Sequence, residues 1–178
     1  MLFKLNCCRF SLIILLFTYV CGALSAQNSS KTTDAFTING MVVSEMKISM
    51  AEIAAMQAED LPEMDLMDKN GKFKMRLTGL RGVPLLPIFS KIQYQVKNPK
   101  DLSLISLVFI PKSGPNAIYS WNEIYGNNTR ENLFVITEKK GEQYTDTEED
   151  ILVIAPADKI NGNRYIKNLQ EIRVIYGE

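Results

Sequence analysis

The chain has 178 residues, 20 basic and 20 acidic side chains, three cysteines and no histidine. Without histidine the commonest general base and the usual zinc ligand are missing, and the balanced charge provides no basic field to attract nucleic acid. About 150 residues remain after the N-terminal leader described next, enough to bury one hydrophobic core, so we expect a single domain.

Residues 1–26 have the pattern of a secretory signal peptide. Lys4 and Arg9 precede an apolar run over 10–24. This run is too short to span a bilayer comfortably and ends in small residues. We place cleavage after residue 26 and interpret residues 27–35 as a flexible polar leader. The sequence therefore predicts an exported protein, periplasmic or extracellular, with no membrane span after cleavage.

The cysteines all lie inside this first segment, at Cys7, Cys8 and Cys21. A mature domain over residues 36–178 would therefore contain no thiol, which excludes disulfides and cysteine catalysis. Two alternatives to cleavage remain open, a retained membrane anchor and a lipoprotein processed at Cys21.

The first half of the domain shows clear local patterns. Alternating apolar residues over 36–42 predict a half-buried strand, and the Ser-x-x-Glu capping box at 49–52 predicts a helix over 49–58. An Asn-Gly turn in 68–71 predicts a hairpin, followed by an alternating strand over 73–77. Gly-Val-Pro-Leu opens a predicted helix over 82–92, with proline near its first turn.

The second half is richer in strands. The nearly continuous apolar stretch 102–110 predicts a strand covered on both faces, and a second capping box predicts a short helix over 120–126. A polar, acidic loop is expected over 138–150. Further strands are expected over 133–137, 151–155 and 172–176. Because strands outnumber helices without strict alternation, we predict an α+β domain of mixed or antiparallel strands with a few short helices.

Two metal-like patterns have simpler interpretations. Residues 65–71 look slightly like a calcium loop, but the alignment would place leucine at two ligand positions, so we prefer the hairpin. The seven methionines between residues 41 and 75 have core-like spacing and are interpreted as packing residues. A surface copper(I) site of Met64 and Met67 is the alternative.

Three segments, taken in order, resemble one family. Residues 36–53 combine a strand, a glycine and a serine-led helix, residues 80–86 read LRGVPLL, and residues 151–172 combine a strand, a proline and a lysine before the last strand. In this order they resemble the molybdopterin-binding domain of sulfite oxidases, over nearly all of residues 36–176. The resemblance implies the α+β fold of that domain, with molybdopterin as the candidate cofactor.

The departures from the family concern its metal and cofactor contacts. The family's molybdenum-binding cysteine should lie between the first helix and the Gly-Val-Pro-Leu segment, and residues 58–79 contain none. The usual tryptophan is replaced by Leu80, and an arginine that contacts the cofactor is replaced by Leu152. Since molybdenum in this family is anchored by a thiolate, the chain resembles a degenerate member that has lost catalysis.

The resemblance carries over one segment as a candidate site. Lys167, with Arg164 and Tyr165 beside it, corresponds to the part of the family that holds the anionic pterin phosphate, and Arg81 would border the same cleft. The alternative for Lys167 is a surface lysine at the start of the last strand. We predict no catalytic residue and no metal ligand.

Three hypotheses for function follow. The first is an exported, non-catalytic module that needs no cofactor and binds a small anionic ligand or a protein partner in the old cofactor cleft. The second is a molybdopterin-dependent oxidoreductase with atypical metal ligation, which bound molybdenum would reveal. The third is an unrelated α+β structural or adhesion domain, which a fold without a cleft between Gly82 and Lys167 would favour.

Overall fold

The computed structural model describes residues 34–126, 133–139, 142–143, 151–158 and 162–177. The predicted signal peptide, most of the predicted leader and most of the acidic loop therefore lie outside the described residues. Within the described part of the chain, no helix is long and apolar enough to cross a membrane.

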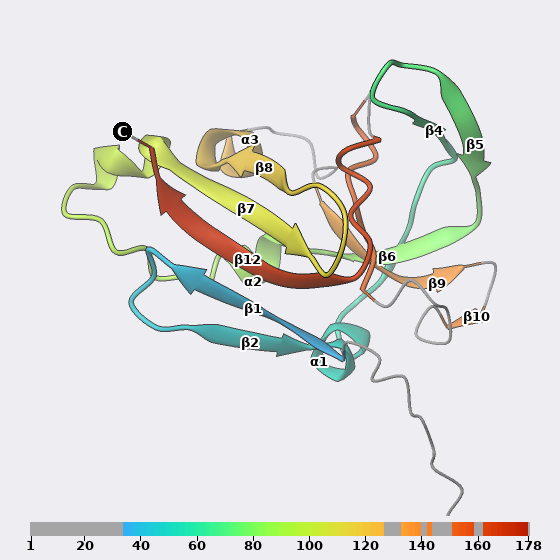
Figure 1. The fold of residues 1–178 in the computed structure, drawn as a ribbon. Coiled ribbons are helices and arrows are strands. Elements are labelled where there is room, and N and C mark those ends of the chain that lie inside the picture. Colours follow the sequence, from blue (N-terminus) through green and yellow to red (C-terminus); the bar gives the residue numbers. More distant parts are fainter. Residues whose placement is uncertain (1–33, 127–132, 140–141, 144–150, 159–161, 178) are drawn as a thin grey trace, which may run out of the picture. The chain divides into compact units, whose positions relative to one another are not determined.

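A five-stranded mixed sheet contains both the first and the last strand of the fold (Figure 1). Its order is β2-β1-β12-β7-β8, in which β1 and β12 are parallel and the other neighbours are antiparallel. The strands are β1 (Ala35–Gly40), β2 (Met46–Ser49), β7 (Ile105–Pro111), β8 (Ala117–Ser120) and β12 (Leu169–Tyr176).

The strand periodicity predicted for β1 and β12 is confirmed except at the end of each strand, because β1 ends at Gly40, before Val42, and Tyr176 is exposed. Phe36 and Ile38 of β1 are fully buried, as is Ile172 of β12. The prediction for 102–110 is wrong in two respects. Its first residues belong to a 3-10 helix, η2 (Pro99–Leu104), and β7 then buries only alternate residues, so one face of the strand is covered more completely than the other.

The glycine that ends β1 is required by a close approach of the backbone. Gly40 has a φ of +89°, and a Cβ at this position would overlap the carbonyl oxygen of Val174 on β12. Only glycine combines this left-handed conformation with this proximity. The parallel pairing of β1 with β12 therefore depends on the glycine of the first motif.

A second sheet of five strands carries the candidate site. Its order is β10-β9-β6-β3, and β11 also pairs with β9. The strands are β3 (Glu59–Asp60), β6 (Leu80–Pro84), β9 (Phe134–Lys139), β10 (Glu142–Gln143) and β11 (Val153–Ile154). The antiparallel β6–β9 register shifts between Arg81 and Gly82, which marks a bulge or irregularity.

The prediction that the Gly-Val-Pro-Leu segment opens a helix is wrong at its start. These residues continue β6, and α2 (Leu86–Phe89) begins only after Leu85, with Pro87 in its first turn. Burial explains the difference, because Gly82 and Val83 lie inside the sheet and pair with β9. Pro84 lies at the end of the strand, where proline is tolerated.

Both predicted capping boxes are present. Ser49 caps α1 (Met50–Ala54) and Ser120 caps α3 (Trp121–Tyr125), each by accepting the N–H of a glutamate three residues later whose side chain reaches back. The first helix is shorter than predicted because the chain leaves it at Ala55 and enters β3 soon afterwards.

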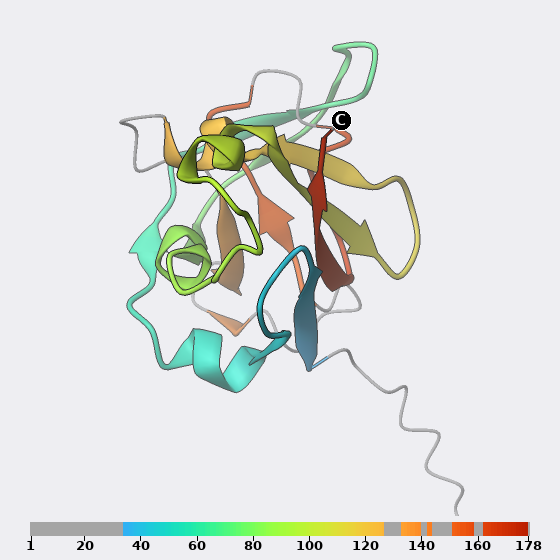
Figure 2. The same ribbon diagram turned by 90° about the vertical axis from the view of Figure 1, so that its left-hand side faces the viewer.

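Two hydrophobic clusters hold the domain together. The larger contains buried residues of both five-stranded sheets and of α2. In the view of Figure 2, α1, α2 and η2 lie on the same side of β1 and β12. The smaller lies between the second sheet and the predicted hairpin, β4 (Met64–Met67) and β5 (Phe73–Leu77). Mixed sheets with a few short helices confirm the α+β class.

Candidate functional site

Arg81 projects from β6 into a set of acceptors from three segments. Its Nη1 lies 2.9 Å from Oε1 of Glu138 on β9, and its Nε lies 3.1 Å from Oδ1 of Asp60 on β3. Its Nη2 donates to the carbonyl oxygen of Ala58 at 3.3 Å. The arginine therefore connects two neighbours of its own strand and the chain that leaves α1.

Gly82 allows this arrangement. A Cβ at Gly82 would come within 2.9 Å of the carbonyl oxygen of Val135, so a larger residue would push β6 away from β9. The register shift beside it aligns Arg81 with Glu138, the pair that forms the ion bridge.

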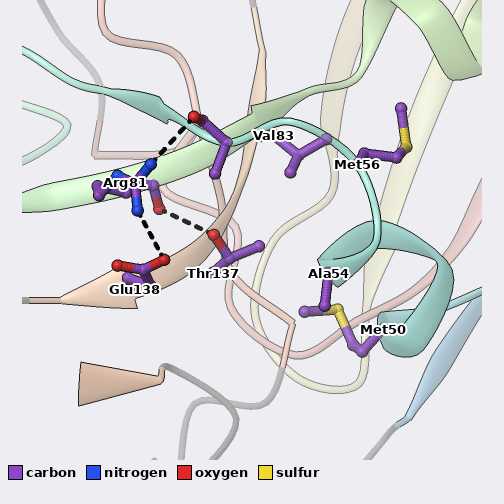
Figure 3. Close-up of a pocket in the computed structure, with 8 residues that line it drawn as sticks. Met50, Ala54, Met56, Arg81, Val83, Thr137 and Glu138 are labelled. Atoms are coloured by element: carbon purple, nitrogen blue, oxygen red, sulfur yellow. Dashed lines mark hydrogen bonds and ion pairs between the residues drawn. The ribbon is translucent and has the colours of Figure 1, made fainter. Parts of the chain in front are cut away.

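A pocket of about 230 Å³ opens beside Arg81 (Figure 3). One wall is formed by α1 and the turn after it, which contribute apolar and thioether side chains, and the other by β6 and β9, which contribute the charged and hydroxyl groups. The lining residues are Met50, Ala54, Met56, Ala58, Arg81, Val83, Thr137 and Glu138. Such a mixture suits a small ligand with an apolar body and a few polar atoms.

The local charge at this pocket does not favour an anion. The lining contains one guanidinium, Arg81, and one carboxylate, Glu138, and the same guanidinium also pairs with Asp60, which lies outside the lining and is 88% exposed. The Arg81 side chain is 42% exposed and Glu138 30% exposed, so water screens part of this field. The arrangement suits a neutral or cationic ligand better than the anion that the sequence predicted.

Arg164 has a comparable set of acidic partners at a different place. Its Nη2 lies 2.9 Å from Glu123 on α3, its Nη1 lies 3.3 Å from Asp158, and its guanidinium carbon lies 4.3 Å from the centre of the Tyr119 ring. It also donates to the carbonyl of Ile118. Arg164 thus fastens its own segment to β8 and α3.

Burial and neighbouring charges shift the pKa values of the groups around Arg164. Burial disfavours the charged form of Glu123, but the hydrogen bond from the Ser120 N–H and the ion pair with Arg164 outweigh it and leave the pKa of Glu123 lowered. Burial raises the pKa of Tyr119, whose hydroxyl is buried without a hydrogen-bond partner among the described residues. Like Arg81, the Arg164 guanidinium pairs with two carboxylates, and these contacts join neighbouring segments of the fold as an anchoring contact does.

Lys167 and Tyr165 lie close together on the segment before β12. The Lys167 ammonium is 5.3 Å from the centre of the Tyr165 ring, the lysine is exposed, and the tyrosine packs against the smaller hydrophobic cluster. Ile166 between them pairs with Val153 through two backbone hydrogen bonds. The structure thus groups Arg164, Tyr165 and Lys167 on one segment, while Arg81 has its own partners. Their joint role as a phosphate site stays a prediction.

The residues at the positions where the resemblance would place a tryptophan and an arginine belong to the core. Leu80 is 4% exposed and Leu152 1% exposed, and both pack in the smaller hydrophobic cluster. The described residues and the sequence therefore do not fit a molybdenum cofactor held in the family's manner. No cysteine follows Cys21, Leu152 offers no donor, and Arg81 and Arg164 already contact carboxylates.

The predicted alternative of a surface copper site does not fit the structure. Met64 is 8% exposed and packs in the smaller hydrophobic cluster, so its thioether is not available at the surface. The calcium-like stretch is a hairpin turn, in which Asp68 accepts the N–H groups of Asn70 and Lys72. Among the described residues, no group of three or more acidic, histidine or cysteine side chains could hold a metal ion.

Sequence reasoning singled out Arg81 but missed its partners. Glu138 was assigned to a loop, whereas it lies on β9, and Asp60 lies on the two-residue strand β3. Met50 and Met56 pack against the larger hydrophobic cluster, as predicted, and they also line the pocket. The apolar run before Glu138 gave a signal for the strand but not for its register with β6.

Comparison with known proteins supports the fold. No protein-family profile and no curated protein matches the sequence. Among solved structures, the sulfane dehydrogenase SoxCD from Paracoccus pantotrophus is similar, with a TM-score of 0.59 and 12% sequence identity. The match covers 84% of this chain and 39% of that chain, so this chain spans well under half of the neighbour's length. The likeness is one of fold.

Proposed function

We propose that the chain is an exported, non-catalytic module that binds a small ligand, or a small group of a protein partner, in the pocket beside Arg81. The observation that carries the proposal is the pocket itself, which combines two thioethers, a guanidinium and a carboxylate on a fold similar to that of a dehydrogenase component. The predicted mature chain has no thiol or imidazole for metal ligation or nucleophilic catalysis.

The charge around Arg81 restricts the class of ligand that the pocket can bind. Because two carboxylates already face the guanidinium, an anionic ligand would be repelled unless it displaced Glu138 or Asp60. A flat, neutral heterocycle such as pterin would keep both ion pairs and place its ring against Met50 and Met56. Pterin is also the ring system of molybdopterin, the cofactor that the family resemblance implies.

Calorimetric titration of the purified protein with pterin, inorganic phosphate and choline tests the proposal. We expect binding of pterin or choline and none of phosphate, and we expect Arg81→Ala to weaken pterin binding about tenfold or more, as removal of a charged hydrogen-bonding partner does. Arg173→Ala is the matched control, because Arg173 also pairs with a carboxylate, Glu171, outside the pocket.

Metal analysis of protein from its native host separates this proposal from the enzymatic alternative. We expect molybdenum far below one equivalent. A stoichiometric amount would overturn the non-catalytic proposal. Failure of all three probes to bind would direct attention to a protein partner at the same pocket.

A further inference from the structure

The β4–β5 hairpin carries a second feature that the Arg81 pocket does not explain. Its turn end extends past the two larger sheets in both views (Figures 1 and 2). The hairpin is held in shape, because Asp65 forms an ion pair with Arg76 across the strands and Asp68 accepts two N–H groups of the turn. A Cβ at Gly162 would overlap the Met67 carbonyl, so this backbone also packs closely against the hairpin.

Two exposed apolar side chains lie on β5 beyond the buried part of the hairpin. Leu66 and Leu77 are buried in the smaller cluster, whereas Phe73 and Met75 are 54% and 50% exposed. Met75 pairs with Leu66 and Phe73 pairs with Met67, and a register shift between the two pairs interrupts the alternation that starts at Leu77. A phenylalanine and a methionine are thus presented to solvent by an ordered element.

The same end of the hairpin is basic. Lys69, Lys72 and Lys74 are all exposed, and residues 69–75 contain no carboxylate. None of the three lysines forms an ion pair with a described residue. Asp68 accepts hydrogen bonds in the turn and interacts electrostatically with Lys69 and Lys74, and Asp65 pairs with Arg76. Residues 68–75 contain three lysines and one aspartate, so the tip of the hairpin has a net positive charge around two exposed apolar side chains.

We propose that this tip, residues 69–75, docks on an anionic lipid surface. Phe73 and Met75 enter the boundary between headgroups and acyl chains, and the lysines contact lipid phosphates, the combination that holds peripheral proteins on such surfaces. Charge disfavours a second copy of the chain as the occupant, because pairing two β5 edges would bring the two rows of lysines together.

Vesicle flotation at low salt tests this directly. The full chain is mixed with vesicles of phosphatidylcholine alone or with phosphatidylglycerol at roughly three to one, since anionic lipid supplies the attraction for lysine. The quantity compared is the ratio of binding to anionic and neutral vesicles, because the apolar segment 10–24, where retained, would bind both. We expect preference for anionic vesicles and loss of that preference in high salt.

Variants assign the preference to the hairpin. Lys72→Glu with Lys74→Glu should lower anionic binding about tenfold or more, since each lysine near the surface contributes roughly a fivefold factor. Phe73→Ser with Met75→Ser should lower it as well. The matched control is Val43→Ser with Ile118→Ser, which removes exposed apolar side chains elsewhere, 64% and 54% exposed.

Because the altered side chains are exposed, thermal unfolding should be unchanged in all variants. Equal binding to both vesicle types would overturn the proposal, as would hairpin variants that bind like wild type. A dimer seen by sedimentation and abolished by the Phe73 and Met75 substitutions would replace the lipid surface with a second copy of the chain. None of these outcomes depends on the Arg81 pocket.

Discussion

Arg81 and Arg164 have the same kind of partners in different surroundings. Each guanidinium lies within ion-pair distance of two carboxylates. Arg164 also lies over the ring of buried Tyr119 and fastens its segment to β8 and α3, whereas Arg81 borders an open pocket. The comparison teaches that ion pairing alone does not distinguish a structural arginine from one at a ligand site. The space beside the guanidinium does.

Position 152 extends the comparison to an uncharged residue. The family resemblance would place an arginine there, and Leu152 instead lies in the smaller hydrophobic cluster with Leu80 and Ile154. This position therefore belongs to the core.

Placing an arginine at position 152 should have the largest effect on stability. Leu152→Arg would bury a guanidinium without a carboxylate, and we expect the free energy of unfolding in urea to fall by roughly 3–5 kcal/mol. Gln170→Arg, at an exposed position of β12, should change it by less than about 0.5 kcal/mol. A stable Leu152→Arg protein would mean that the position can still open towards a ligand.

Replacing each arginine by alanine should lower the free energy of unfolding by different amounts at the two clusters. Arg164→Ala loses two ion pairs and the contact with the Tyr119 ring, and we expect a loss of about 1–2 kcal/mol in urea unfolding. Arg81→Ala should lose less than about 1 kcal/mol, because its pairs are more exposed. Equal losses would contradict the distinction between an anchoring arginine and one at a pocket.

A smaller effect on the free energy of unfolding is expected at acidic pH. The pKa of Glu123 is lowered below its ordinary value of 4.5 in the folded protein, so its ionised form stabilises the fold above that pH and the contribution disappears as the pH falls further. Between about pH 6 and about pH 3, Glu123→Gln should therefore lose less stability than wild type. Glu45→Gln, an exposed control, should follow wild type, and a Glu123 variant that does the same would refute the assignment.

Local features could be predicted from the sequence. The caps of Ser49 and Ser120 and the turn at Asn70-Gly71 formed as expected, because each depends on hydrogen bonds between residues at most four apart. The strands β1 and β12 could also be predicted, because their alternating apolar residues reflect one buried face.

Elements whose limits depend on packing were predicted less well. The Gly-Val-Pro-Leu segment has the composition of a helix start, yet pairing with β9 keeps it extended through Pro84. The apolar run that includes β7 gave no sign that Pro99–Leu104 would wind into a 3-10 helix capped by Asn98. In both cases a tertiary contact overrides the local preference.

The amino-acid sequence alone determined which chemistry the chain lacks, because no cysteine follows Cys21 and histidine is absent, and it determined the short-range turns and caps. Only the tertiary structure decided that Arg81 meets Glu138, a partner 57 residues away, and that a cavity opens beside them. The physical reason is that ion pairs and pockets depend on strand register. A single shift between Arg81 and Gly82 changes which side chains face each other, and no local pattern records it.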